Sequence, residues 1–328
     1  MEDLLMGLRA AGEPTRLRLL VLCAHSELSV SELVQIVGQS QPRVSRHLKL
    51  LVEAGLLMRF REGSQVFFRI ADRNSGYAHL ARTLVDLVSE DDDAMHRDLA
   101  RLQTVRDRRA AEADVYFQTV ASQWDEIRSL HVSEQEVESA LLSLVGDFRV
   151  SDYLDIGTGT GKIVGLLAGC AERAVGVDSS RPMLKLARAN LEKRQLRNAH
   201  VRLGDMYGLP FGDDSFDLVT LHLVLHYAQD PSSVFGEIAR VLRPGGRLLL
   251  VDFASHDLED LCASHHHVHR GFSDSYIEAQ CDELALRCEV ARKLPANPLT
   301  TVIWSVSKPA VEKSNTSGEY NDNSIWTH

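Results

Sequence analysis

The sequence predicts an α/β protein made of two units with different architectures. Apolar residues recur at helical spacing through the first 56 residues, and two stretches of alternating polarity follow around residues 62–65, which is a hairpin signal. Beyond residue 148, short apolar runs alternate with helical ones, as in a parallel sheet covered on both faces. We expect a mainly helical unit over residues 1–75, a helical connector over 76–112, an α/β unit over 113–308 and a disordered polar tail over 309–328.

The composition is that of an ordinary soluble protein. Of the 328 residues, 25% are charged and 44% are hydrophobic, which is enough for two separate cores. The apolar runs are strand-sized and no secretory signal is evident, so we expect no membrane segment. Five cysteines without a CxxC pair fit a reducing compartment, and we predict a cytoplasmic protein.

The net charge of −10 is unevenly distributed. Residues 1–80 contain ten Lys or Arg and eight Asp or Glu, a net charge of +2, so the remaining residues carry −12. A locally basic segment on an acidic chain predicts that only the N-terminal unit contacts nucleic acid.

The N-terminal unit reads as four helices and a hairpin, the order of a winged helix-turn-helix. The helices are expected at residues 1–12, 15–25, 29–38 and 40–56, and the hairpin at 57–70. The fourth helix would enter the major groove, and its candidate DNA-contacting residues are Gln41, Arg43, Ser45, Arg46 and Lys49. The wing would add phosphate contacts from Arg59, Arg61 and Arg69. A solvated helix face is the alternative, but residues 40–49 contain no acid, which favours DNA binding.

Residues 3–75 resemble the ArsR/SmtB family of winged-helix repressors. The resemblance is carried by GEPTRLRLL (12–20), ELSVSEL (27–33), SQPRVSRHLKLLVEAGL (40–56) and REGSQVFFRI (61–70). It implies a homodimer that binds an inverted-repeat operator in double-stranded DNA and is released by a ligand. Ser29 and Ser31 stand where the family's metal site has cysteines, and serine hydroxyls are poor ligands for soft metals. His79, the candidate for the family's other metal site, has no correctly spaced partner, so we expect no metal site.

The connector divides into two parts. Leu80, Leu84, Leu87 and Val88 form a stripe that suits a dimer helix. The arginine-rich part beyond residue 93 has interleaved charges, which usually mark a solvated helical spacer.

The α/β unit begins with a strand that runs into the glycine-rich turn DIGTGTGK, residues 155–162. Gly157, Gly159 and Gly161 follow a GxGxG spacing, whereas dinucleotide-binding turns have GxGxxG. Three acids, Asp155, Asp178 and Asp205, end successive strands. They would hold an amino group, a ribose diol and an exocyclic amine, which together describe S-adenosylmethionine.

Residues 113–308 resemble the class I S-adenosylmethionine-dependent methyltransferases. The matching motifs are YLDIGTGTGK, VGVDSSRPMLKLAR, LGDMYGLPF, FDLVTLHLVLHY and VLRPGGRLLLVD. The resemblance implies a Rossmann-like seven-stranded sheet whose last strands lie near 291–294 and 301–308. It also places Met183 beside the ribose, and Asp205 with the Met206 amide at the adenine. A helix over residues 114–131 would lie over the cofactor, and its stripe of Phe117, Val120, Ala121 and Trp124 is either a lid or ordinary packing.

The acceptor in this fold would lie above the carboxyl ends of the fourth and fifth strands. The candidate catalytic residues there are His226 and His222, and the alternative for His226 is a helix-start histidine bonded to a carbonyl. His265 and His269 are four residues apart and could share one face of a helix that lines the substrate site, binds metal or lies on the surface. The cysteines do not match the motifs of arsenite methyltransferases, so arsenic methylation is not expected.

Two functions follow from these patterns. The chain is either a DNA-binding regulator that also methylates an unknown small molecule, or a regulator whose second unit only senses S-adenosylmethionine or its product S-adenosylhomocysteine. Both functions require that the ligand binds the DNA-competent and DNA-free states with different affinity.

Overall fold

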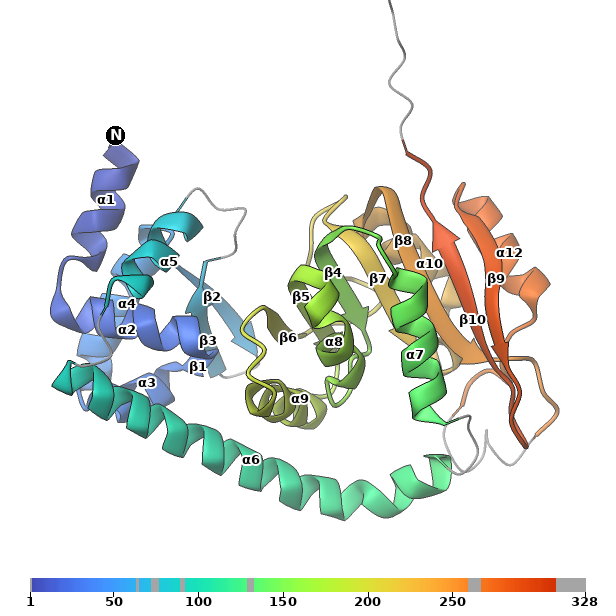
Figure 1. Ribbon diagram of the computed structural model, residues 1–328, viewed down its shortest axis with the longest axis horizontal. Helices are drawn as coiled ribbons and strands as arrows, with labels where there is room; N and C mark the ends of the chain where they lie inside the picture. The colour runs from blue at the N-terminus through green and yellow to red at the C-terminus, as the bar shows by residue number, and fades with distance from the viewer. Residues whose placement is uncertain are drawn as a thin grey trace, which may run out of the picture.

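The computed structural model describes residues 2–62, 65–71, 77–88, 92–128, 133–258 and 267–310, without the side chains of residues 3, 78, 113, 114 and 116–128. It consists of an N-terminal helical unit and a C-terminal α/β unit that lie side by side, with the long helix α6 (Asp93–Arg128) running along both (Figure 1). None of the described helices has both the length and the apolar composition that a membrane span requires. The predicted lid stripe at residues 117–124 and the predicted disordered tail beyond residue 310 lie outside the described side chains and residues.

The N-terminal unit is a winged helix-turn-helix. It contains, in order, α1 (Glu2–Ala11), α2 (Pro14–His25), β1 (Leu28–Ser29), α3 (Val30–Val37), α4 (Gln41–Glu53), β2 (Leu57–Glu62), β3 (Gln65–Ile70) and α5 (Ala78–Asp86). The three strands form an antiparallel sheet in the order β1-β3-β2, and β2 and β3 are the predicted hairpin.

Ser29 caps α3. The Ser29 hydroxyl accepts a hydrogen bond from the Glu32 N–H, and the Glu32 carboxylate accepts one from the Ser29 N–H at 2.8 Å, which together form a capping box. Ser29 therefore has a structural role at the position where related repressors would carry a metal ligand.

The first half of α6 belongs to the core of the N-terminal unit. Leu102 and Val105 are 1% exposed and pack with Leu33 and Ile36 of α3 and with residues of α2. The Arg101 guanidinium donates a hydrogen bond to the Ile36 carbonyl oxygen at 2.8 Å. The interpretation of this segment as a solvated spacer is therefore wrong, because its apolar residues complete a neighbouring core.

The α/β unit is built on one sheet of seven described strands in the order β6-β5-β4-β7-β8-β10-β9, of which β10 is antiparallel to both of its neighbours. The last two strands are close to the predicted positions. The elements are α7 (Glu134–Val145), β4 (Val150–Ile156), α8 (Lys162–Leu167), η1 (Ala168–Cys170), β5 (Ala171–Asp178), α9 (Arg181–Lys193), β6 (Ala199–Leu203), β7 (Phe216–His222), η2 (Leu225–Tyr227), α10 (Pro231–Val241), β8 (Leu242–Phe253), α12 (Asp274–Glu283), β9 (Arg287–Leu294) and β10 (Thr301–Ser307).

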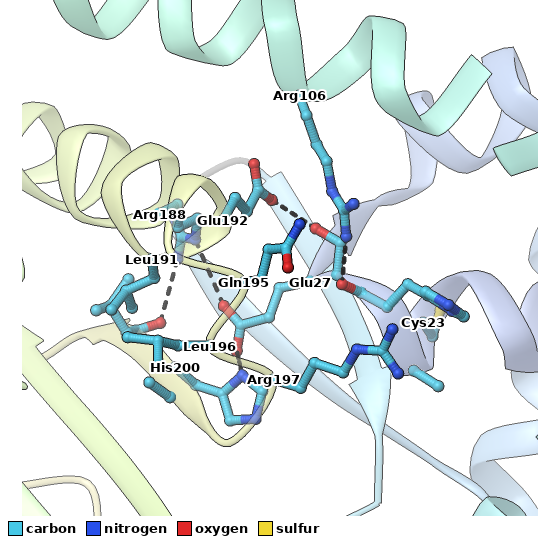
Figure 2. Close-up of a pocket in the computed structure, with 15 residues that line it drawn as sticks. Cys23, Glu27, Arg106, Arg188, Leu191, Glu192, Gln195, Leu196, Arg197 and His200 are labelled. Carbon is cyan, nitrogen blue, oxygen red and sulfur yellow. Dashed lines mark hydrogen bonds and ion pairs between the residues drawn. The ribbon is translucent and has the colours of Figure 1, made fainter. Parts of the chain in front are cut away.

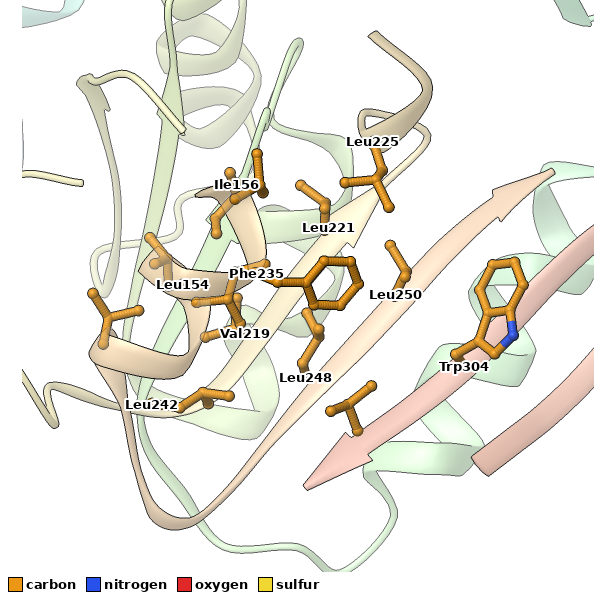
Figure 3. Packing of buried hydrophobic residues seen from close by; sticks show 14 of the residues in the cluster. Leu154, Ile156, Val219, Leu221, Leu225, Phe235, Leu242, Leu248, Leu250 and Trp304 are labelled. Atoms are coloured by element: carbon orange, nitrogen blue, oxygen red, sulfur yellow. The ribbon is translucent and has the colours of Figure 1, made fainter. Parts of the chain in front are cut away.

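Both faces of this sheet are buried. On one face, Phe235 of α10 packs against Leu221, Leu248 and Leu250, while Trp304 of β10 extends the same cluster (Figure 3). Alternate residues of the same strands pack on the other face, for example Leu249. Since the chain order changes direction at β4, the carboxyl ends of β4, β5 and β7 form the edge where ligands bind in sheets of this type.

Candidate functional site

The glycine turn between β4 and α8 lies at this edge of the sheet. Gly157 and Gly161 have φ angles of +68° and +75°, which side chains rarely allow, and a Cβ on Gly157 would collide with Val224. A Cβ on Gly159 would meet only the Gly157 carbonyl oxygen, at 4.0 Å. The backbone at Gly159 therefore has room for a ligand to approach closely.

Asp178 ends β5 beside this turn and fixes its shape. The Gly159 N–H donates to Asp178 Oδ2 at 2.8 Å, and the Ser180 N–H donates to Oδ1 at 2.7 Å. The side chain is half-buried, and each carboxylate oxygen has two lone pairs, so the group can accept further hydrogen bonds from a ligand.

Asp155 lies beneath the turn and is only 2% exposed. Its two carboxylate oxygens accept hydrogen bonds from the Thr220 hydroxyl at 2.6 Å and the Thr158 hydroxyl at 2.7 Å. Burial raises its pKa to about 6, against the hydrogen bonds from Thr220 and Thr158, which lower it. In this structure Asp155 supports the turn from below; contact with an amino group of the cofactor stays a prediction.

This burial gives Asp155 an expected effect on stability. The folded state binds the Asp155 proton more tightly than the unfolded state, so the stability contributed by this proton is lost as pH rises from about 4 to about 6. We expect Asp155→Asn, which cannot ionise, to raise the urea midpoint at pH 7.5 and to have less effect at pH 4. Equal effects at both pH values would contradict a raised pKa. Asp282→Asn, an exposed change on α12, is the control.

The remaining predicted cofactor residues lie at the same edge of the sheet. Met183 stands in the first turn of α9, directly after β5. Asp178 is opposite Leu203 in the parallel pairing of β5 and β6, so Asp205 and Met206 follow β6 at the level of Asp178. Asp205 is exposed and its Oδ1 accepts a hydrogen bond from the Tyr207 N–H at 3.1 Å. The acids predicted for the ribose and the adenine thus end neighbouring strands.

His226 and Asp252 form a buried pair at the carboxyl ends of β7 and β8. His226 Nδ1 lies 2.8 Å from Asp252 Oδ1, and the two residues are 2% and 0% exposed. Asp252 also accepts hydrogen bonds from the backbone N–H groups of Phe253, at 2.8 Å, and His226, at 3.2 Å. A carboxylate with three donors holds the imidazole with Nδ1–H toward Asp252, which leaves Nε2 to accept a proton.

His267 is a neighbour of this pair that the sequence analysis did not single out. It is 7% exposed, and its ring centroid is 4.2 Å from that of His226. The run HHHVHRGF contains it, but the assumed helical spacing directed attention to His265 and His269. Residues 267–271 do not form a helix, so the expectation of a shared helix face is wrong for His269, while His265 lies outside the described residues. His269 Nε2 instead lies 2.9 Å from the Ala228 carbonyl oxygen.

The predicted catalytic residue His222 ends β7 and is half-buried. It lies four residues before His226, and the turn between them belongs to the same edge of the sheet. Asp252 holds the His226 imidazole and backbone by hydrogen bonds, so His226 is well placed for proton transfer.

The predicted recognition helix presents a polar face to solvent. Val44, Leu48 and Leu51 of α4 are fully buried, whereas the candidate DNA-contacting residues are all exposed: Gln41, Arg43, Ser45, Arg46 and Lys49. Arg59 and Arg61 on β2 are exposed as well. These side chains are accessible to a duplex.

The predicted phosphate contact by Arg69 is wrong. Arg69 is 1% exposed, and its Nε lies 3.7 Å from Glu27 Oε1, which is also buried. Arg69 belongs to β3, and this face of the hairpin lies against the α/β unit: the Arg188 guanidinium stacks 4.7 Å from the Phe67 ring centroid and pairs with Glu62. The docking of the two units therefore removes Arg69 from the surface.

Comparisons with known proteins match the two units separately. Residues 13–58 match the family model described as bacterial regulatory protein, arsR family, and residues 154–250 match a methyltransferase domain model. The chain is 35% identical to an uncharacterized methyltransferase, YcgJ, of Bacillus subtilis over 99 residues, 30% of this chain and 39% of that protein. It is 30% identical to a demethylmenaquinone methyltransferase of Lactococcus lactis over 141 residues, 42% of this chain and 56% of that protein.

An arsenite methyltransferase of Halobacterium salinarum is 37% identical over 102 residues, which cover 30% of this chain and 26% of that protein. The matches to these three curated relatives thus span between about a quarter and three fifths of their lengths. The crystal structure of YcgJ is 21% identical, covers 54% of this chain and 99% of its own, and has a TM-score of 0.48. The chain therefore carries an N-terminal segment that matches the arsR-family regulatory model, followed by a segment that matches a methyltransferase domain model.

Proposed function

We propose that this chain is a DNA-binding transcriptional regulator that also transfers the methyl group of S-adenosylmethionine to a small-molecule acceptor. The observation that carries the catalytic half is the buried His226–Asp252 hydrogen bond, 2.8 Å long, at the carboxyl edge of the sheet. The open side of the glycine turn at Gly159 and the half-buried Asp178 carboxylate lie at the same edge and fit the proposed cofactor. The exposed basic face of α4 supports the DNA-binding half.

The residues at the carboxyl edge of the sheet would have separate roles in methyl transfer. The Gly159 backbone, Asp178 and Asp205 would hold the cofactor, with Met183 and the Met206 amide beside it, and the bound sulfonium supplies an electrophilic methyl group. His226, held by Asp252 with Nδ1–H donated, would accept the acceptor's proton on Nε2 as its nucleophile attacks. A general base at this position suits an acceptor whose nucleophile carries an ionisable proton, such as a hydroxyl on an aromatic ring.

The second candidate is a receptor that binds the cofactor or S-adenosylhomocysteine without catalysis. It is favoured by α9, whose first turn carries Met183 and whose later residues Arg188 and Glu192 pair with the N-terminal unit and with α6. A ligand at the start of α9 would thus act on a helix that contacts the DNA-binding unit.

The proposed DNA-bound form is a homodimer on an inverted-repeat operator. Apolar residues exposed on α1 support self-association: Leu4, Leu5, Met6 and Leu8 are each more than 40% exposed, and Leu87, next to α5, is 77% exposed. Of the predicted dimer stripe, Leu80 and Leu84 instead pack partly onto the core of the N-terminal unit.

Operator affinity in the presence of each ligand tests the regulatory half. A duplex selected from random DNA by the full chain would be titrated without ligand, with S-adenosylmethionine, with S-adenosylhomocysteine and with Zn²⁺, using fluorescence anisotropy. We expect one cofactor form to change the dissociation constant by about fivefold or more, a usual size for allosteric coupling, and Zn²⁺ to have no effect. If only Zn²⁺ changed the dissociation constant for DNA, the ligand would be sensed by the N-terminal unit and not by the α/β unit.

The catalytic half is tested with a labelled methyl donor. Full-length protein would be incubated with the donor and a small-molecule fraction of a cell extract, and labelled products would be separated by chromatography. A labelled product is expected. Intact cofactor binding without any labelled product would support the receptor.

A further inference from the structure

A cavity of about 220 Å³ lies between the two units (Figure 2). One wall is the end of α2 and the residues after it, Cys23 to Glu27; another is Arg106 of α6; the third runs from Arg188 on α9 to Val201 on β6. Ala199 and His200 begin β6, whereas Asp178 ends β5, so in this parallel pair the cavity and the cofactor residues occupy opposite edges of the sheet. The cavity is therefore a separate site.

The cavity has an apolar side. Leu191, Leu196, Ala199 and Val201 line it from the α/β unit, and the Cys23 side chain lines it from α2. Burial raises the pKa of the Cys23 thiol far above its usual range, so this group behaves as a small apolar side chain. The volume is below the roughly 300–1,000 Å³ of pockets for drug-sized ligands, and it fits a molecule the size of a free amino acid.

The polar side of the cavity has buried atoms without hydrogen-bond partners. Glu192 uses Oε1 to accept hydrogen bonds from the Ser26 hydroxyl at 2.5 Å and from Arg109 at 2.6 Å, but its buried Oε2 has none. Arg106 donates from Nη2 to the His25 carbonyl oxygen at 2.6 Å, while its buried Nε has no acceptor. Glu27, 7% exposed, likewise has no hydrogen bond to Oε1, although His200 Nδ1 lies 3.5 Å and Arg69 Nε 3.7 Å from that oxygen. Buried polar atoms of this kind usually have a partner in the functional state.

The buried atoms that lack a hydrogen bond belong to groups of both charge signs. Burial lowers the pKa of Arg106, as Arg109 and Arg197 also do, whereas Glu192 opposes the shift. Burial also raises the pKa of Glu27, although Arg188 and Arg69 oppose the shift. A carboxylate near Arg106 and a cationic donor near Glu27 and Glu192 would each relieve a desolvated charge, whereas a simple anion would meet both glutamates.

We infer that this cavity binds a small zwitterion of the α-amino acid class with an uncharged aliphatic side chain. Its carboxylate accepts from Arg106 Nε and from the exposed Arg197 at the cavity wall. Its ammonium group donates to Glu192 Oε2 and Glu27 Oε1, and its side chain contacts Leu191, Leu196 and Val201. Because residues of both units line the cavity, the ligand stabilises their docked arrangement.

Calorimetric titration of the full chain with L-norleucine tests this inference. Saturating S-adenosylhomocysteine keeps norleucine out of the predicted cofactor site. A parallel titration without S-adenosylhomocysteine gives the same dissociation constant if the cavity and the cofactor site are separate. We expect a dissociation constant in the millimolar range or below. N-acetyl-L-norleucine, which lacks the ammonium group, and L-norleucinamide, which lacks the carboxylate, should each bind at least about tenfold more weakly, since each loses a charge-assisted hydrogen bond.

Two variants place the site. Arg106→Gln and Glu192→Gln should each weaken norleucine binding about tenfold or more, whereas Lys193→Gln, an exposed neighbour on α9, should bind as the unchanged protein does. Circular dichroism shows whether each variant is folded. The comparison of norleucine with its two analogues uses the unchanged protein, so it holds even if a variant fails to fold. The inference would be overturned if norleucine did not bind at about 10 mM, a concentration that already corresponds to a very weak affinity. Equal binding of norleucine and its two analogues would overturn it as well. Since none of these readouts uses DNA or methyl transfer, failure of the proposed function leaves them unaffected.

Discussion

Asp178→Ala is expected to weaken S-adenosylhomocysteine binding by about two to four orders of magnitude. The carboxylate holds the Gly159 N–H at 2.8 Å and the Ser180 N–H at 2.7 Å, so its loss releases both the glycine turn and the start of α9. It also removes the predicted hydrogen bonds to the ribose. Two charge-assisted hydrogen bonds at about 1.5–3 kcal/mol each account for this range.

Isothermal titration calorimetry measures the effect directly. Asp282→Ala, an exposed acid on α12, is the matched control for the lost charge and should bind as the unchanged protein does. A loss smaller than about tenfold in the folded Asp178→Ala protein would show that the cofactor does not lie on this strand end.

His226→Asn is expected to reduce the rate of methyl transfer by about 10²–10⁴-fold, the usual contribution of a general base. The asparagine amide can replace the Nδ1–H donor to Asp252, so the local hydrogen bond is kept while the proton acceptor at Nε2 is lost. The readout is single-turnover transfer to the acceptor found in the labelling experiment. Cofactor affinity, measured in parallel, should not change.

Asp252→Asn separates positioning from catalysis. Asp252 contacts the imidazole and not the reacting atoms, so its replacement should shift the pH profile of the rate rather than abolish cofactor binding. His79→Gln, an exposed change on α5, is the control. An undiminished rate in His226→Asn would remove His226 from the mechanism.

The parts of the fold that follow from local pattern were predictable from the sequence. The glycine turn and the acids at the ends of β5 and β6 are each visible within about ten residues of sequence, and the order of strands in a parallel sheet brings their ends to one edge. The buried and exposed faces of α4 likewise follow from helical periodicity, as Val44 and Leu48 show.

The interface between the units could not be predicted in this way. Arg188 lies 161 residues from Glu27 and 126 residues from Glu62, so no local spacing relates them. The prediction that Arg69 contacts a DNA phosphate was wrong for the same reason. The alternation of polar and apolar residues along a strand distinguishes its two faces, but it does not show that one of these faces packs against another domain. His267 was missed because a loop conformation, not a helical period, brings it to His226.

The ion pairs between the units also set an order of events during synthesis. Glu62 leaves the ribosome 126 residues before its partner Arg188, a delay of about 6–25 s at ordinary elongation rates. During that interval the winged helix can fold on its own core, with Glu27 and Glu62 still in water. The α/β unit then docks onto a folded surface, so a nascent chain that ends before α9 would carry a winged helix whose hairpin, Arg69 included, is still uncovered.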